Sequence, residues 1–131
     1  MNTRAWRILV IDDDEDLLDM VQFFLARDGY RVTTAKNGQE GLDAVAASMP
    51  DLILLDMKMP VMNGWVFAKE YHRRYDKGAP IIVVTAADDA RQRAIETGAV
   101  GWISKPFDAD DLLRAVSAQF TERDRALRRR W

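Results

Sequence analysis

Short runs of apolar residues alternate along this chain with longer segments in which apolar residues recur every three or four positions. The short runs are typical of strands buried in a parallel sheet, and the periodic segments are typical of amphipathic helices. Strands are predicted at about residues 6–11, 30–34, 52–56, 81–85 and 101–104, and helices at about 15–28, 39–47, 65–75, 88–97 and 109–120 or beyond. This alternation predicts an α/β fold in which a doubly wound, five-stranded parallel sheet carries helices on both faces.

Turn and capping residues mark the ends of these segments. Gly29 and Gly98 each follow a predicted helix, where glycine favours the left-handed conformation of a C-cap. Pro50 interrupts the pattern before the third strand, and Asp108 is the expected N-cap of the last helix. No repeat, low-complexity tract or internal linker divides the chain.

Composition narrows the class of protein. The chain has 131 residues, which fits one domain, with 48% hydrophobic and 31% charged residues. The absence of cysteine excludes a disulfide scaffold and thiolate chemistry. No apolar run approaches the roughly 20 residues of a membrane helix, and the N-terminus leads directly into a strand. We therefore expect a cytoplasmic protein without a membrane segment or a cleaved signal peptide.

Charge is unevenly distributed. The net charge is −2, but residues 121–131 hold five arginines against two acidic residues. This shift divides the chain into a predicted domain at residues 1–120 and a basic tail at 121–131, which is a helix extension or a linker. The run of three arginines at 128–130 is too short to favour contact with nucleic acid over a solvated helix end. No direct binding to nucleic acid is expected.

Acidic and basic side chains stand where the predicted strands end. Asp12, Asp13 and Asp14 follow the first strand, Asp56 ends the third, Thr85 ends the fourth and Lys105 closes the fifth. The C-terminal ends of parallel strands meet at one edge of a sheet, where open α/β folds bind ligands. Clustered carboxylates repel one another unless a cation joins them, and Mg²⁺ prefers such oxygen ligands. The pattern predicts a site for a divalent cation and a phosphoryl group, although acids such as Asp14 also suit a helix N-terminus.

The order of these motifs resembles the response-regulator receiver domains of two-component signalling, a family that includes chemotaxis regulators. The residues that carry the resemblance are 8–13, which end in two aspartates, 50–56 (PDLILLD), Met59 and Pro60 with Gly64, 83–86 (VVTA) and 105–107 (KPF). The resemblance covers about residues 6–120. It implies a flavodoxin-like, three-layer sandwich with strand order 2-1-3-4-5.

The resemblance also implies roles for single residues. Asp56 is the expected phosphoacceptor, taking a phosphoryl group from a sensor histidine kinase or a phosphotransfer protein. Asp13 and Asp56, with the backbone carbonyl of Lys58, are expected to bind Mg²⁺, or Mn²⁺ in its place, and Asp12 acts through a metal-bound water. Lys105 is expected to pair with Asp56 and then with a phosphoryl oxygen.

Two further groups are expected at the phosphoryl group: the hydroxyl of Thr85 and the backbone N–H of Ala86. Lys58 and Ala87 flank the expected path of the hydrolytic water in this family. Because an alanine cannot orient a water molecule, we predict slow loss of the phosphoryl group. Trp102 stands where the family usually has a switching Tyr or Phe, and it is either a half-buried edge aromatic or a switch whose burial changes on phosphorylation.

Output is expected through the face made by the helix at 88–97, the strand at 101–104 and the last helix, toward a downstream protein or a missing output domain. Residues 98–101 lack the acidic pair of many DNA-binding members, so nothing here favours a charge-paired dimer. His72 is interpreted as a solvated residue on the polar side of its helix rather than a phosphotransfer histidine. Catalysis is expected to be limited to the chain's own phosphorylation and dephosphorylation.

Two alternatives remain open at this stage. One is a receiver that docks partners without being phosphorylated. The other is a phosphatase of the haloacid-dehalogenase type, with Asp12 as the nucleophile and Asp14 as the acid and base. That family normally has Thr or Val at the position of Asp16, and it leaves Asp56 unexplained.

Overall fold

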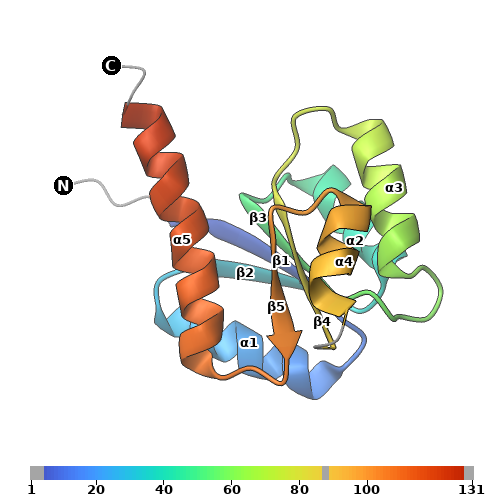
Figure 1. Cartoon of the computed structure of the whole chain (residues 1–131), viewed down its shortest axis with the longest axis horizontal. Coiled ribbons are helices and arrows are strands. Elements are labelled where there is room, and N and C mark those ends of the chain that lie inside the picture. The colour runs from blue at the N-terminus through green and yellow to red at the C-terminus, as the bar shows by residue number, and fades with distance from the viewer. Residues whose placement is uncertain (1–4, 87–88, 129–131) are drawn as a thin grey trace.

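The computed structural model describes residues 5–86 and 89–128, in which strands and helices alternate throughout (Figure 1). The elements are β1 (Arg7–Ile11), α1 (Glu15–Arg27), β2 (Arg31–Ala35), α2 (Gly38–Ala47), β3 (Leu52–Leu55), α3 (Gly64–Arg74), β4 (Ile81–Ala86), α4 (Ala90–Thr97), β5 (Gly101–Lys105) and α5 (Ala109–Arg128). The five predicted strands and five predicted helices are therefore confirmed, with ends that differ from the predicted ones by at most two residues, apart from the long extension of the last helix.

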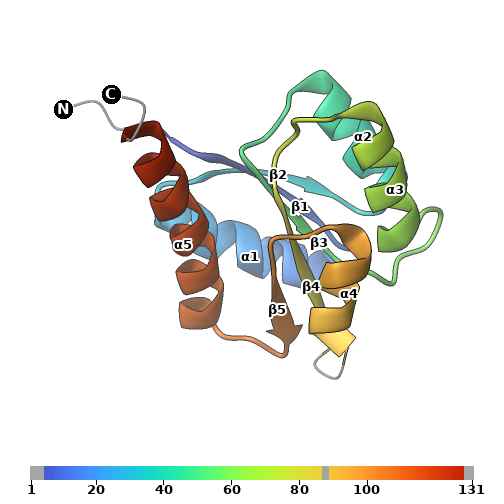
Figure 2. The same cartoon turned by 45° about the horizontal axis from the view of Figure 1, so that its top comes forward.

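The strands form one parallel sheet in the order β2-β1-β3-β4-β5. Helices α1 and α5 pack on one face, and α2, α3 and α4 cover the other (Figure 2). The predicted doubly wound, three-layer arrangement and its strand order are confirmed.

Successive side chains of the central strands point to opposite faces of the sheet and contribute to two hydrophobic cores, one on each face. Ile8 and Val10 of β1 face the core under α1 and α5, whereas Leu9 and Ile11 face the core under α2 and α3. All four residues of β3 are buried, as expected for a central parallel strand covered on both faces. The polar edge strand β2 exposes three of its five residues, which explains its weak apolar signal in the sequence.

Register between β1 and β3 decides where the acidic residues lie. Ile11 pairs with Leu55, so the next residue on each strand, Asp12 and Asp56, reaches the same edge of the sheet. The backbone N–H of Asp56 donates to the carbonyl of Ile11 at 2.9 Å. Two carboxylates far apart in sequence therefore become neighbours through strand pairing.

The predicted caps are found at or next to their expected positions. The Oδ1 atom of Asp108 accepts a hydrogen bond from the backbone N–H of Asp111 at 2.8 Å, which confirms it as a capping residue. Gly98 ends α4 in the left-handed conformation with φ 68°. The C-cap of α1 is Asp28, one residue earlier than predicted, and Gly29 follows it with φ 93°.

Helix α5 continues past the predicted end at residue 120 to Arg128 without a break. Within this extension, Nη1 of Arg123 donates to the backbone oxygen of Asp51 at 3.0 Å, and its guanidinium lies 5.1 Å from the centre of the Trp6 ring. Trp6 in turn stacks on Phe120 with ring centres 4.7 Å apart. The first turn of the extension is thus part of the packed domain. Neither α5 nor any other described helix is long and apolar enough to cross a membrane.

Candidate functional site

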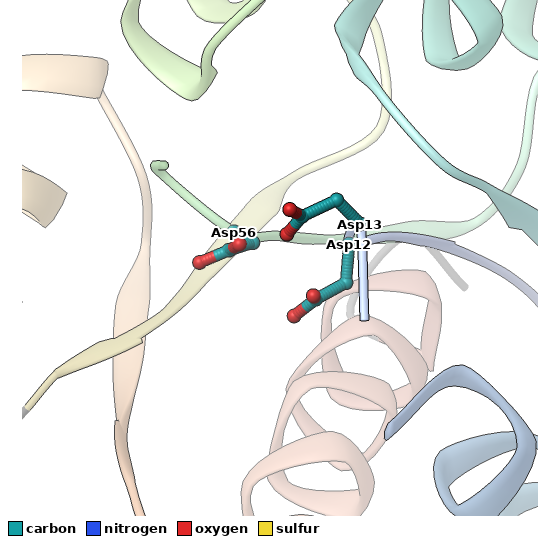
Figure 3. Close-up of side chains that lie close together, drawn as sticks. All are labelled: Asp12, Asp13 and Asp56. Carbon is teal, nitrogen blue, oxygen red and sulfur yellow. The ribbon is translucent and has the colours of Figure 1, made fainter. Parts of the chain in front are cut away.

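Three carboxylates meet at the C-terminal edge of the sheet. Asp12, Asp13 and Asp56 each offer an oxygen atom, and these atoms all lie within 4.8 Å of one another. Figure 3 shows their carboxylates on the same side of the ends of β1 and β3. Asp12 and Asp56 are buried, with 2% and 6% of their surface exposed, whereas Asp13 is open to solvent. A cluster of hard oxygens with one open side fits a small divalent cation that keeps several waters.

Local backbone contacts hold the two buried carboxylates. The Oδ1 atom of Asp12 accepts a hydrogen bond from the N–H of Asp14 at 2.9 Å. The Oδ1 atom of Asp56 accepts one from the N–H of Met57, also at 2.9 Å. Each carboxylate therefore caps the turn that leaves its own strand, which fixes its direction before any ligand is bound.

The loop after β3 folds back tightly over the end of that strand. The N–H of Gly64 donates to the carbonyl of Met57 at 2.9 Å. A Cβ atom at position 64 would lie 2.6 Å from the backbone oxygen of Asp56, so only glycine fits. This close approach gives a physical reason for the glycine at the end of the Met59, Pro60 and Gly64 motif.

Lys105 supplies the positive charge of the site. Its Nζ atom lies 3.0 Å from Oδ2 of Asp12 and 3.4 Å from Oδ1 of Asp56. Burial by itself would lower the pKa of Lys105, but the hydrogen bonds and charges of Asp12 and Asp56 outweigh it, and the pKa lies above its ordinary value. The ammonium is therefore charged and bridges two carboxylates from neighbouring strands.

Asp56 has an unusual protonation equilibrium. Burial raises its pKa from 3.8 to about 6, the charge of Asp12 adds to this effect, and Lys105 opposes it. One ammonium therefore does not fully compensate the negative charge of the cluster. A bound cation would favour the ionised form and leave Asp56 as a carboxylate near neutral pH.

A pocket of about 220 Å³ opens beside Asp56, between the strand ends and the helices α3 and α4. It is lined by Met57, Lys58, Trp65, Thr85, Ala86, Asp89 and Arg93. Thr85 is buried, Lys58 is exposed, and Ala86 pairs in register with Lys105. The structure thus brings Lys58, Thr85 and Ala86 to one pocket, as the sequence predicts, while Ala87 lies outside the described residues.

Two aromatic predictions have different outcomes. Trp102 is 47% exposed on the edge strand β5 and borders a groove of about 470 Å³ between β5 and α5. His72 is exposed, as expected, and its Nε2 atom also donates a hydrogen bond to the backbone oxygen of Thr97 in the last turn of α4, at 2.8 Å. The sequence pattern could not show this contact, because it depends on how α3 packs against α4.

Comparison with known proteins identifies the family. The family model of the response regulator receiver domain matches residues 8–117. The DNA-binding response regulator MtrA of Mycobacterium tuberculosis is 36% identical over 126 residues, which are 95% of this chain and 54% of MtrA. The chain therefore spans about half the length of the curated relatives it matches.

Solved structures agree with the same family. The chemotaxis response regulator CheY4 of Vibrio cholerae superposes with a TM-score of 0.80 at 32% identity, covering 88% of this chain and 99% of that one. A CheY-like receiver domain protein from Methanospirillum hungatei superposes with a TM-score of 0.84 at 30% identity, covering 94% and 99%.

Proposed function

The chain belongs to the response-regulator receiver family, and we propose that it is a signalling switch activated by phosphorylation of Asp56. The observation that carries this proposal is the cluster of three carboxylate oxygens within 4.8 Å, with an ammonium 3.0 and 3.4 Å from two of the side chains. The donor is a sensor histidine kinase or a phosphotransfer protein. The chain does not act on an external substrate.

The acidic cluster is the proposed cation site. Asp13 and Asp56, together with the backbone carbonyl of Lys58, would hold Mg²⁺, or Mn²⁺ in its place, and Asp12 would contribute through a water molecule. When bound, the ion neutralises charge on the phosphoryl oxygens. The exposure of Asp13 and the burial of Asp56 support this division, since one side of the site stays open to water.

The protein's own groups position the transfer. A carboxylate oxygen of Asp56 forms the bond to phosphorus as the bond between phosphorus and the donor's nitrogen or oxygen breaks. Lys105 leaves its contacts with the free carboxylates and binds one phosphoryl oxygen. The Thr85 hydroxyl and the Ala86 N–H bind another, which draws Thr85 toward the site.

Intact-mass spectrometry tests this function directly. After incubation with acetyl phosphate and Mg²⁺, we expect one added phosphoryl group, lost in Asp56→Asn and without metal. No adduct in a folded, Mg²⁺-binding protein would favour a receiver that docks without phosphorylation. An adduct that survives Asp56→Asn but disappears in Asp12→Asn would instead indicate a phosphatase-type site.

Phosphate loss is proposed to be slow because Ala87 cannot orient a water molecule and Lys58 shields the phosphoryl group. Introducing Ala87→Glu is expected to shorten the lifetime of the aspartyl phosphate about tenfold, since an acid can position the attacking water. The lifetime is measured by mass spectrometry after removal of the donor, with Lys58→Met as a second variant. An unchanged lifetime in Ala87→Glu would contradict this role.

Trp102 is proposed to change burial on phosphorylation. Its 47% exposure leaves room for a more buried position against the groove beside β5. In a variant that keeps Trp102 as its only tryptophan, we expect phosphorylation to reduce fluorescence quenching by acrylamide about twofold. Equal quenching before and after phosphorylation would assign Trp102 a purely structural role.

The signal is proposed to leave through the face formed by α4, β5 and α5, toward a downstream protein or an output domain. Residues 1–120 form the receiver in this view, and 121–131 extend α5 or lead into a linker. We place the protein in the cytoplasm, without direct contact to nucleic acid or membrane.

A further inference from the structure

Helix α4 is held to the sheet by little apolar surface. Among its eight residues, the buried ones are Ala90, Ala94 and Thr97, all with small side chains. Its N-cap residue, Asp89, makes no side-chain capping hydrogen bond. Since burial of large apolar side chains contributes most to helix docking, the position of α4 must depend strongly on other contacts.

Those contacts are polar and come from α3. The indole Nε1 of Trp65 donates to Oε1 of Glu96 at 2.8 Å, and the guanidinium of Arg93 lies 5.3 Å from the centre of the Trp65 ring. Nε of Arg93 lies 3.0 Å from Oε1 of Glu96. With the bond from His72 to the end of α4, these residues form an α3–α4 clamp: Trp65, His72, Arg93 and Glu96.

Arg93 is the charged member of the clamp that reaches the pocket beside the phosphoacceptor, which Trp65 also lines. It lines that pocket together with Thr85 and Ala86. Its Nε atom is buried and has no hydrogen-bond partner of good geometry in the part of the chain that the structure describes. A guanidinium has five N–H donors, and within the described residues Arg93 uses one of them in a hydrogen bond, from Nη2 to Oε2 of Glu96 at 3.3 Å, so donor capacity remains for another acceptor.

We infer that Arg93 senses the phosphoryl group, exchanging Glu96 for a phosphoryl oxygen when Asp56 is modified and so opening the α3–α4 clamp. This inference rests on the proposed function. The ion pair of Arg93 with Glu96, whose side chains are 23% and 34% exposed, offers one negative charge, whereas a phosphoryl group adds nearly two negative charges and strong acceptor oxygens. A guanidinium binds such oxygens better than a single carboxylate.

The exchange of Glu96 for a phosphoryl oxygen at Arg93 would couple phosphorylation of Asp56 to the position of α4. When Arg93 turns toward the pocket, Trp65 loses its cation contact and Glu96 loses its ion partner. Only small side chains then hold the first turns of α4, so the helix becomes free to shift. The clamp is therefore a two-state element that the charge on Asp56 biases.

Beryllofluoride with Mg²⁺, which stands in for a phosphoryl group, provides the test. The protein is labelled with 5-fluorotryptophan, and the ¹⁹F signal of Trp65 is assigned with Trp65→Phe. We expect this signal to move on binding in the unsubstituted protein. Arg93→Gln should weaken beryllofluoride binding about fivefold and abolish the shift of the Trp65 signal, because the positive charge that binds the phosphoryl group is removed.

Glu96→Gln makes the test discriminating. Its amide oxygen can still accept the Trp65 hydrogen bond, but it no longer competes for Arg93, so binding should tighten about threefold. Arg91→Gln, an exposed arginine on the same helix, is the matched control and should change binding less than about twofold. Opposite effects of the Arg93 and Glu96 variants would support phosphoryl sensing.

Effects in the same direction, or no effect of Arg93→Gln, would overturn the inference, because a merely structural clamp responds alike to losing either partner. Failure of the unsubstituted protein to bind, or binding that persists in Asp56→Asn, would overturn the proposed function and this inference with it. Binding that is lost in Asp56→Asn but unaffected at Arg93 would overturn the inference alone.

Discussion

Replacing Lys105 by methionine is expected to slow phosphorylation of Asp56 by acetyl phosphate about 100-fold. The Nζ atom of Lys105 lies 3.0 Å from a carboxylate oxygen of Asp12 and 3.4 Å from one of Asp56. As the phosphoryl group approaches, negative charge accumulates on its oxygens beside carboxylates that already repel it. Methionine keeps the length and volume of the side chain but removes the charge, so the loss reports on electrostatics rather than packing.

Rates are measured by intact mass at saturating Mg²⁺, with folding checked by circular dichroism. Lys36→Met is the matched control, because Lys36 also pairs with a carboxylate, Glu15 at 2.8 Å, but does so at the exposed surface. Its rate should change less than about twofold. If Lys105→Met were phosphorylated at a rate within about threefold of the unsubstituted protein, Mg²⁺ alone would be sufficient to neutralise the negative charge of the transition state.

The position of the site could be predicted because strand ends are visible in the sequence. Apolar runs stop at Asp12 and Asp56, and the rule that parallel strands end at one edge of a sheet brings these residues together. The pattern alone did not fix which strands are neighbours. That order came from the family resemblance, and the pairing of Ile11 with Leu55 confirms it.

The α3–α4 clamp could not be predicted in the same way. Trp65 and Glu96 are separated by 31 residues, and both lie on helices whose apolar periodicity says only which side faces the sheet. Their contact depends on the rotation of α3 against α4 and on side-chain rotamers, which no local pattern encodes. The hydrogen bond from the exposed His72 to Thr97 could not be predicted for the same reason, since a polar helix position is compatible both with solvent and with a neighbouring helix end.

Asp56→Asn is expected to stabilise the metal-free protein by about 2 kcal/mol near pH 7.5, although it removes the proposed phosphoacceptor. The pKa of Asp56 is raised from 3.8 to about 6 in the folded state, chiefly by burial. At neutral pH the folded state therefore holds a carboxylate in surroundings that disfavour its charge. Asparagine has nearly the same shape, and its oxygen can still accept the hydrogen bond from Met57.

The sign of the pH dependence follows from the raised pKa. Below about pH 3 the carboxyl group is protonated in both the folded and the unfolded states, so its charge costs nothing. Between pH 3.8 and about 6 the unfolded state ionises first, and the stability of the unsubstituted protein falls as pH rises through this window. The difference between Asp56→Asn and the unsubstituted protein should therefore be near zero at about pH 3 and reach its full value above about pH 6.

Urea unfolding in the presence of a chelator, repeated across this pH range, measures the effect, with Asp76→Asn as an exposed control expected to stay within about 0.5 kcal/mol. Adding Mg²⁺ should reverse the order of stability, because a cation that binds only the folded carboxylate cluster stabilises the unsubstituted protein more than the variant. Destabilisation by Asp56→Asn at neutral pH without metal would show that Lys105 fully compensates the cluster. A stabilisation that did not vary with pH would point to packing as its cause. Asp56 is thus predicted to lower the stability of the metal-free protein and to raise the stability of the metal-bound one. A site that is kept ready for a metal ion and a phosphoryl group requires this combination.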